Sequence, residues 1–259
     1  MIDQLTVLAA LLGLVVGSFL NVVIVRLPAG RSLWGPHSAC PACGAAIAWH
    51  DNIPLLSFAL LRGRCRTCGG AISWRYPIVE AATGGLFVLA YATLGLGADL
   101  AIALLLLPAL VAITAIDLEH QIVPDVITLP GIVTGFLANV AFGRVFWLDS
   151  LIGVLAFGGV FLVIIKASEA IMNVPGGGMG GGDMKLGAML GAFLGWKITL
   201  FAVLVASVVG GVVAVGLLAS GTKGRKEPIP FGPFLASGGV LGLLWGERVI
   251  TWYMSAFTV

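Results

Sequence analysis

The chain has 259 residues, of which 59% are hydrophobic and only 10% are charged, and its formal net charge is +2. Soluble domains carry about 25% charged residues, so this composition excludes a soluble globular protein. It predicts an all-α polytopic membrane protein, because continuous Leu, Val and Ala runs indicate helices, whereas β-barrel strands alternate apolar and polar residues. The small net charge gives no indication of a nucleic-acid partner, and we expect none.

Hydropathy predicts about eight transmembrane helices. In chain order they are 5–25, 78–96, 100–116, 126–143, 150–167, 184–196, 198–220 and 232–250. The sixth is short for the ~20 residues that a full crossing needs. A single bent segment over 184–220 is the alternative, and it would give seven spans.

The loop between the first two spans, residues 26–77, is too small to bury a core of its own, and domains of this size usually need a metal or a disulfide. It carries two Cys-x-x-Cys pairs, each followed by glycine: Cys40-Pro-Ala-Cys43 and Cys65-Arg-Thr-Cys68. This spacing is typical of zinc ribbons, in which four thiolates bind one structural Zn²⁺ ion. The alternatives are two disulfides, redox-active cysteines, an iron–sulfur cluster or four plain thiols.

Lys and Arg predict the orientation, because cytoplasmic loops are enriched in them. With eight spans, one side of the membrane carries most of the basic residues: Arg26, Arg31, Arg62, Arg64, Arg66, Arg75, Lys166, Lys185, Lys223, Arg225 and Lys226. The other side carries only Arg144, Lys197 and Arg248. The cysteine loop is therefore expected in the cytoplasm, where disulfides are rare, and this favours zinc.

Two aspartates border apolar runs, where an ionised carboxylate costs roughly 2.5–3.5 kcal/mol on insertion scales. Asp117 ends the run 100–116, and Asp183 opens a later one. The predicted topology puts both at helix ends on the cytoplasmic side, so they can meet. Two carboxyl groups that meet can activate water, because one holds a proton while the other accepts one. A solvated interfacial acid is the alternative for Asp117.

The segment 117–125 is predicted to be a short turn between two helices, since Pro124 disfavours helix at Val123. Asp125 lies at the end of this turn. It either supports the acidic pair or caps the helix that follows.

A glycine-rich segment, Pro175–Gly182, leads directly into Asp183, and seven of its eight residues are Gly or Pro. Glycine allows backbone angles that other residues rarely adopt. We therefore expect an active-site loop, with Gly180, Gly181 and Gly182 next to the aspartate, that approaches a peptide closely or moves as a gate. The alternative is a loose linker with Asp183 as a helix cap.

Together these residues resemble the prepilin leader peptidases, the polytopic aspartic proteases of type IV pilus and type II secretion systems. The resemblance covers nearly the whole chain and rests on motifs in a fixed order. These are Gly17-Ser-Phe-Leu-Asn21, Arg26-Leu-Pro28, both cysteine pairs, Arg62-Gly63, Arg75-Tyr-Pro77 with Glu80, Asp117-Leu through Pro124-Asp125, Gly180-Gly-Gly-Asp183-Met-Lys185 and Pro230-Phe-Gly-Pro233.

The resemblance implies a membrane aspartic endopeptidase in which Asp117 and Asp183 form the catalytic pair, without a metal in proteolysis, and Asp125 is a supporting acid. It implies substrates among the prepilins and pseudopilins, cleaved at the cytoplasmic face of the bacterial inner membrane. It also implies N-methylation of the product with S-adenosylmethionine, whose binding residues it does not identify. The zinc ligands that it implies are Cys40, Cys43, Cys65 and Cys68.

The expected organisation is a first transmembrane helix over 1–25, a cytoplasmic zinc-ribbon-like loop with the methyltransferase region over 26–77, and a transmembrane aspartic peptidase domain over 78–259. Two other classes of function compete with this interpretation. A transporter or proton relay would use the same aspartates, but it leaves the cysteine loop unexplained. A non-catalytic assembly scaffold would use the cysteine loop to bind partners and would work without either aspartate.

Overall fold

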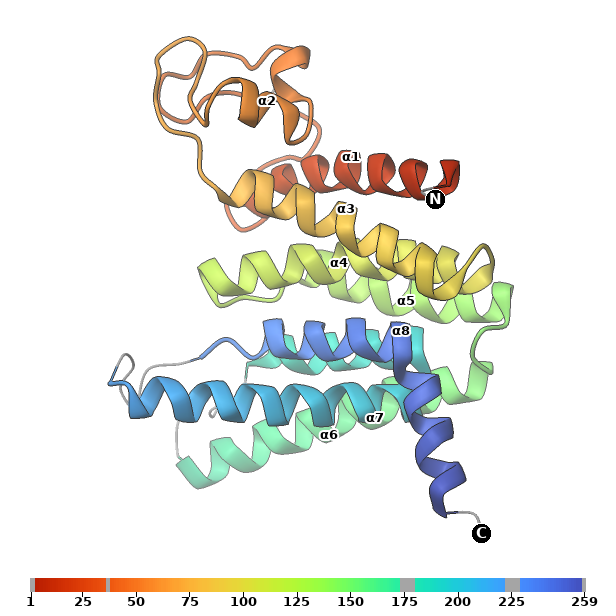
Figure 1. Cartoon of the computed structure of the whole chain (residues 1–259). Helices are drawn as coiled ribbons and strands as arrows, with labels where there is room; N and C mark the ends of the chain where they lie inside the picture. The colour runs from red at the N-terminus through yellow and green to blue at the C-terminus, as the bar shows by residue number, and fades with distance from the viewer. Residues whose placement is uncertain (1–2, 36–37, 173–179, 222–228, 258–259) are drawn as a thin grey trace. The chain divides into compact units, whose positions relative to one another are not determined.

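The computed structural model describes residues 3–35, 38–172, 180–221 and 229–257, which form helices joined by loops (Figure 1). The helices are, in chain order, α1 Gln4–Arg26, η1 Trp49–Asn52, α2 Leu56–Leu60, α3 Arg75–Leu94, α4 Ala98–His120, α5 Asp125–Phe142, α6 Trp147–Met172, α7 Gly181–Ala219 and α8 Gly232–Phe257. The described residues contain two isolated β-bridges and no strand.

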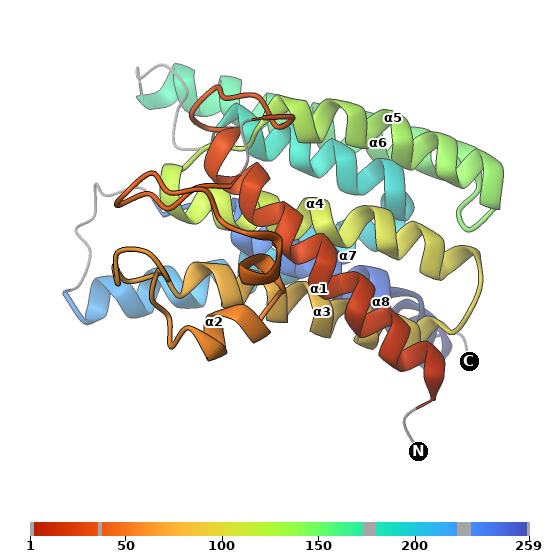
Figure 2. The same ribbon diagram turned by 90° about the horizontal axis from the view of Figure 1, so that it is seen from above.

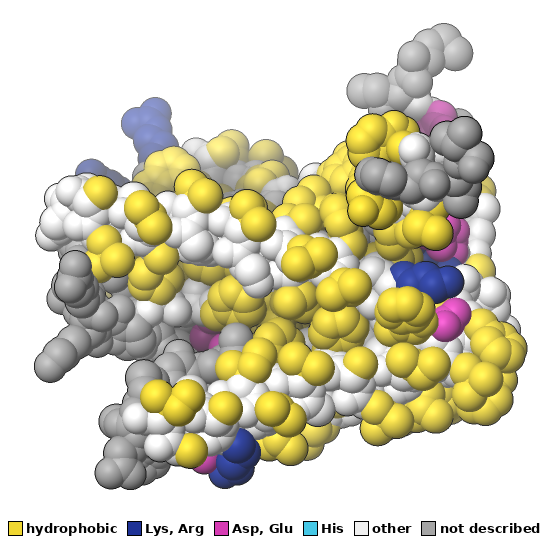
Figure 3. All heavy atoms as spheres, turned by 90° about the horizontal axis from the view of Figure 1, so that it is seen from below, with side chains coloured by type: hydrophobic (Ala, Val, Ile, Leu, Met, Phe, Trp, Pro, Cys, Tyr) yellow, Lys and Arg dark blue, Asp and Glu magenta, His cyan; other side chains and the backbone are white. Residues whose placement is uncertain are grey.

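Six of the described helices, α1, α3, α4, α5, α6 and α7, are long and apolar enough to cross a membrane. They leave large apolar side chains exposed, among them Leu155, Val163, Leu204 and Val212. Figure 3 shows hydrophobic side chains spread over one broad face, with few charged ones among them. Such a surface suits contact with lipid, and the prediction of an all-α polytopic membrane protein is confirmed.

The chain divides into two compact units, residues 1–96 and 97–259. In the first unit α1 packs across α3 (Figure 2). Glycines allow this close approach: a Cβ atom added at Gly13 would lie 2.8 Å from the Cα atom of Gly84, and one at Gly17 would lie 2.8 Å from the Cα atom of Glu80. Small residues four apart are a common means of packing helices in membranes.

Two polar side chains are buried near the end of this helix pair that leads into the cysteine loop. The side-chain amide of Asn21 donates to the carbonyl of Tyr76 at 3.1 Å, which ties α1 to the start of α3. The carboxylate of Glu80 accepts the backbone N–H of Leu55 at 2.9 Å. Leu55 lies in the loop, so this bond fixes the middle of residues 26–77 to α3.

In the second unit α4 extends further than predicted. It continues through His120, so Asp117 lies in its last turn rather than at the start of a turn over 117–125. The helix ends at Gln121, whose φ of 54° is left-handed. The expected boundary was too early because hydropathy falls at the first charged residue, whereas the backbone stays helical until a breaker such as Pro124 is near.

The predicted sixth and seventh spans are the two halves of α7, which separate at Gly195, where φ is 71° and ψ is 171°. Both halves lie against α8 (Figure 1). A Cβ atom added at Gly239 would meet Leu190 of the first half, and one at the adjacent Gly238 would meet Ala202 of the second half. The chain therefore reverses direction at Gly195, which agrees with two separate segments rather than one bent span.

The first half of α7 is the central helix of the second unit, and every residue from 186 to 195 is buried. Glycines of the surrounding helices come close to it. A Cβ atom at Gly135 of α5 would lie 2.6 Å from the Phe193 ring, and one at Gly153 of α6 would lie 2.6 Å from the Gly191 carbonyl oxygen. A helix buried on all sides is normally apolar all round, so Asp183 in its first turn is exceptional.

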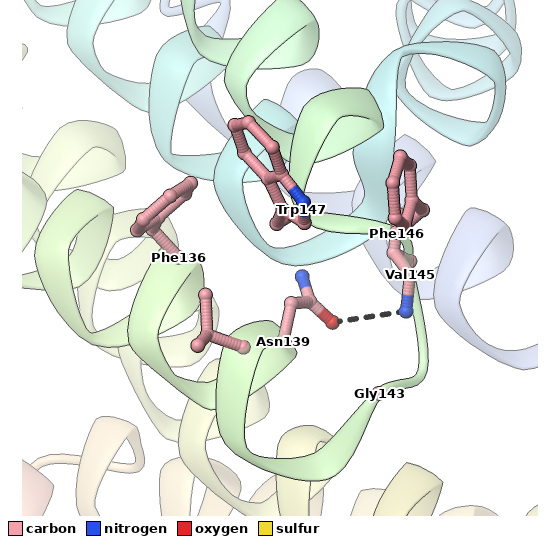
Figure 4. Close-up of a pocket in the computed structure, with 7 residues that line it drawn as sticks. Phe136, Asn139, Gly143, Val145, Phe146 and Trp147 are labelled. Atoms are coloured by element: carbon pink, nitrogen blue, oxygen red, sulfur yellow. Dashed lines mark hydrogen bonds between the residues drawn. The ribbon is translucent and has the colours of Figure 1, made fainter.

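At the Gly195 end of this central helix, side chains replace the helical hydrogen bonds that the break removes. The amide nitrogen of Asn139 donates to the carbonyls of Ala192 at 2.8 Å and Phe193 at 3.0 Å. The hydroxyl of Ser150 also donates to the Ala192 carbonyl, at 2.9 Å. The side-chain oxygen of Asn139 accepts the N–H of Val145, as Figure 4 shows. These bonds hold the break in place within an apolar bundle.

Candidate active site

Asp117 is 5% exposed, on the side of α4 that faces the interior of the second unit. Its Oδ2 atom accepts a hydrogen bond from the backbone N–H of Gly232, the first residue of α8, at 3.1 Å. The carboxyl group is thus held away from bulk solvent with one backbone donor. This environment does not agree with the alternative of a solvated interfacial acid.

Asp183 is the third residue of α7 and is 8% exposed. Gly180 takes the cap position of this helix, and the N–H of Asp183 donates to the Gly180 carbonyl at 3.1 Å. The alternative in which Asp183 itself caps the helix is therefore wrong. Asp117 lies in the last turn of α4 and Asp183 in the first turn of α7, and these two helix ends lie at the same end of the second unit (Figure 1). The fold thus brings together the two buried aspartates that the sequence singles out.

The first turn of α7 packs against the turn between α4 and α5, which follows Asp117 in the chain. A Cβ atom added at Gly182 would lie 2.6 Å from the Cβ atom of Val123, so the two backbones approach closely there. Val123 belongs to the short turn 121–124 between α4 and α5. The contact fixes the distance between the helix end that carries Asp117 and the helix start that carries Asp183.

Of the described glycines before Asp183, Gly182 allows close packing against Val123 and Gly180 takes the cap position of α7. Gly180 has φ −72° and ψ 143°, while Gly181 and Gly182 are helical, so none of the three needs the left-handed region. This differs from the expectation of an irregular loop over these three residues. The rest of the predicted loop, residues 176–179, lies outside the described residues, as do Lys223, Arg225 and Lys226.

Asp125 is the first residue of α5, and Pro124 takes the cap position, so the alternative in which Asp125 caps the helix is wrong. The Asp125 carboxylate instead forms an ion pair with the ammonium group of Lys185, one turn after Gly182 in α7. The pair is accessible to solvent, with side-chain exposures of 54% for Asp125 and 29% for Lys185. Asp125 therefore supports the approach of the two helices and lies outside the buried pair.

We expect Asp125→Asn and Lys185→Met each to lower kcat/KM for peptide cleavage only a few-fold. An exposed ion pair contributes at most about 1 kcal/mol, which corresponds to roughly a five-fold change. A double-mutant cycle on kcat/KM measures the coupling between the two side chains. Loss of cleavage by Asp125→Asn as deep as that of the buried aspartate variants would instead place Asp125 in the catalytic pair.

A larger effect is expected for Gly182→Val. The added side chain would overlap Val123 and push the first turn of α7 away from the turn 121–124. A displacement of about 1 Å at a reacting group can lower a rate about 10²-fold. Gly181→Val is a matched control, because a Cβ atom at Gly181 has no neighbour within 4 Å. Equal cleavage rates for the two variants would show that the Gly182–Val123 contact does not position the aspartate.

One pocket in the described residues is remote from the aspartates. It has a volume of about 520 Å³ and is lined by Phe136, Asn139, Val140, Gly143, Val145, Phe146 and Trp147 (Figure 4). These residues lie at the end of α5 and the start of α6, whereas Asp125 and the aspartate pair lie at the other end of α5. The pocket therefore belongs to the region that supports the break at Gly195 and is not part of the acidic site.

In the first unit the four cysteines converge. Their sulfur atoms all lie within 4.8 Å of one another, and those of Cys40 and Cys68 are 3.9 Å apart. None is in a disulfide. Four ligands at about 2.3 Å around a tetrahedral ion lie roughly 3.8 Å apart, so the cluster fits a metal ion of zinc size. The cluster could hold such an ion without rearrangement of the fold.

The two halves of this cluster have the same local structure. Gly44 follows Cys43 with φ 71° and donates to the Cys40 carbonyl at 2.8 Å, and Gly69 follows Cys68 with φ 69° and donates to the Cys65 carbonyl at 2.9 Å. This left-handed position explains the glycine after each pair. Backbone N–H groups of Cys68 and Thr67 donate to the sulfur of Cys65 and lower the pKa of its thiol to about 6. The thiolate form that a metal requires is therefore favoured at Cys65.

The contact between Gly232 and Asp117 was not predicted from the sequence. The motif Pro230-Phe-Gly-Pro233 gave a signal, since a glycine between two prolines before a helix is unusual. Its role depends on a backbone donor that is distant in the chain from Asp117, and side-chain chemistry gives no indication of such a donor.

Two sequence families match the chain. The bacterial peptidase A24 N-terminal domain matches residues 11–94, and the type IV leader peptidase family matches residues 104–215. These segments fall within the first and second compact units. No solved structure matches the chain.

Curated relatives are similar over most of their length. The prepilin leader peptidase/N-methyltransferase of Aeromonas hydrophila is 41% identical over 275 residues, which cover 96% of this chain and 94% of that protein. The protein of the same name from Pseudomonas aeruginosa is 40% identical over 94% of this chain and 91% of its own. That from Myxococcus xanthus is 44% identical over 83% of this chain and 64% of its own. The chain thus belongs to the type IV leader peptidase family.

Proposed function

We propose that this protein removes the leader peptide of type IV prepilins and related pseudopilins and then N-methylates the new amino terminus. The observation that carries the peptidase proposal is the pair of buried carboxyl groups, Asp117 and Asp183, at one end of the second unit. The name that the relatives carry supports both activities. The transporter alternative gains no support from these relatives.

In the proposed reaction one carboxylate of the pair takes a proton from a water molecule, and the water attacks the scissile carbonyl carbon. The other carboxyl group, which is protonated, donates its proton to the carbonyl oxygen. The tetrahedral intermediate then collapses, and the pair delivers a proton to the leaving amine. The two groups act as a coupled unit, so the shared proton belongs to the pair rather than to one residue.

We assign methyl transfer to the region of residues 26–77. Cys40, Cys43, Cys65 and Cys68 are the proposed ligands of a structural zinc ion, which would hold this small region in a defined fold. S-adenosylmethionine supplies the methyl group when bound. The bond from Leu55 to Glu80 would keep the zinc-bound region attached to α3, where the first unit enters the membrane.

The proposed location is the bacterial inner membrane, with the aspartate pair and the cysteine loop at the cytoplasmic face. Within the second unit, the ends of α4 and α6 and the starts of α5, α7 and α8 lie at one end (Figure 1). Lys166 and Lys185 are on these segments, whereas Arg144 and Lys197 are near the Gly195 end. In the sequence, Lys223, Arg225 and Lys226 lie between α7 and α8, and with them the aspartate end has more basic residues than the Gly195 end, which supports a cytoplasmic position.

The experiment that tests the function uses the purified protein in detergent or lipid and a synthetic prepilin peptide whose basic leader ends in glycine. Mass spectrometry of the products is expected to show leader removal without S-adenosylmethionine, and one additional methyl group on the mature fragment when it is added. Absence of cleavage by a correctly folded preparation that contains metal would reject the peptidase proposal. Cleavage without methylation would reject only the second activity.

A further inference from the structure

The start of α8 reaches into the site of the two aspartates. Gly232 is the first residue of this helix, and its N–H group donates to the Oδ2 atom of Asp117 at 3.1 Å in a buried position. Within the described residues the Asp117 carboxyl group has no other hydrogen-bond partner from the protein. The bond therefore fixes one oxygen of this carboxyl group and leaves Oδ1 without a donor among the described residues.

The N–H of Gly232 is available because of the residues that follow it. The first N–H groups of a helix have no partner within the helix. Pro233 has no N–H group, and the N–H groups of Phe234 and Leu235 both donate to the carbonyl of Phe231, each at 3.0 Å. Only the Gly232 donor in this turn is therefore directed at Asp117.

The absence of a side chain at Gly232 is a second requirement. A Cβ atom there would lie 2.6 Å from Oδ2, 3.1 Å from Cγ and 3.4 Å from Cβ of Asp117. Gly232 does not have a positive φ, so its backbone angles are open to other residues. Any other residue type would instead displace the carboxyl group or the helix start.

We infer that Gly232 is a positioning residue for proteolysis, which fixes the orientation of the Asp117 carboxyl group. The inference rests on the proposed peptidase function. It adds a third segment to the site, the start of α8, beside the end of α4 and the start of α7. It also gives a physical role to the motif Pro230-Phe-Gly-Pro233, in which the second proline removes a competing donor.

The test compares Gly232→Ala with Gly239→Ala in the full-length protein. Both variants add a methyl group to α8 at 2.6 Å from a neighbour, which is Oδ2 of Asp117 at Gly232 and Cδ2 of Leu190 at Gly239. Gly232→Ala is expected to lower kcat for cleavage about 10²-fold, with KM changed by less than three-fold. Gly239→Ala should keep most of its kcat, because a leucine side chain can move.

The pH profile of kcat/KM is the readout that a packing role would not change. A packing defect lowers the whole profile, whereas an altered hydrogen bond to one carboxyl group of the pair changes the pH at which activity falls. Equal losses of kcat in both alanine variants, with an unchanged profile, would overturn the inference. So would wild-type kcat in Gly232→Ala.

A stability measurement tests the same contact if Gly232→Ala accumulates poorly. Removal of the carboxyl group in Asp117→Ala makes room for the added methyl group, so Gly232→Ala should lower the unfolding temperature less in that background than in the wild type. Additive effects would contradict the contact. Other results would reject the proposed function itself: no cleavage of the peptide by the wild-type protein, or normal cleavage by Asp117→Asn.

Discussion

Asp117→Asn and Asp183→Asn are each expected to lower the rate of leader cleavage by roughly 10²–10⁴-fold, the range typical of general acid–base groups. Asparagine has nearly the same shape as aspartate but cannot exchange a proton. Both side chains are buried and are proposed to act as one unit, so the double variant should lose little more than either single one. Single-turnover cleavage of a prepilin peptide measures the effect.

Glu119→Gln is the matched control for this prediction. Glu119 lies two residues after Asp117 in the same helical turn, but it is exposed. The same change of one carboxylate to an amide should therefore leave cleavage within a few-fold of the wild-type rate. Substantial turnover by Asp117→Asn or Asp183→Asn, in protein that inserts and accumulates normally, would remove that residue from the catalytic pair.

Cys43→Ser is expected to release the bound metal and to abolish methylation, while leader cleavage falls much less. Structural zinc sites in small domains contribute about 10–16 kcal/mol of apparent binding free energy, so loss of one of four thiolates should unfold residues 26–77. The aspartate pair lies in the other compact unit, which has its own buried core. Metal analysis together with the two activity assays measures the separation.

Thr67→Ser is the control for the cysteine variant, since Thr67 lies between Cys65 and Cys68 but provides no sulfur ligand. Its backbone N–H, which donates to the Cys65 sulfur, is retained. This variant should bind metal and methylate normally. Carefully purified wild-type protein without zinc, but with full methylation, would contradict the structural role of the metal.

Much of the fold follows from the sequence because long apolar runs have one stable solution in lipid, which is a helix that satisfies its own backbone. The end of the α4 span could not be located by hydropathy, because Asp117 is polar and helical at once. The reversal within α7 depends on one positive φ, at Gly195. The chain has 37 glycines, so composition alone does not identify the one at which the helix breaks.

The acidic side chains of the candidate site could be predicted from the sequence, but the backbone contacts that hold them could not. Carboxylates next to apolar runs are costly, so Asp117 and Asp183 were evident as candidates. The Gly232 donor and the Gly182–Val123 contact depend on how close two backbones come, and a sequence read without the fold contains no distances. A helix cap was the alternative role for Asp125, because aspartate is common at that position. Its ion pair with Lys185 could not be predicted, since it depends on the packing of α5 against α7.

The short first half of α7 has a consequence for the depth of the reaction. Its Gly195 end is surrounded by charged and amphipathic side chains of the kind found at a membrane–water interface. The indole N–H of Trp196 donates to Oδ1 of Asp149 at 3.0 Å, and Nε of Arg144 lies 3.4 Å from Oδ1 of Asp99. At about 1.5 Å per residue, Asp183 is only about 18 Å along the helix from that surface. The hydrocarbon layer is about 30 Å thick. The carboxyl pair is therefore about 12 Å short of the opposite surface, so the bilayer must thin there or water must reach the pair from that surface. If the pair cleaves the substrate as proposed, the scissile bond is hydrolysed below the level of the lipid surface, either in a thinned bilayer or in a water-filled opening.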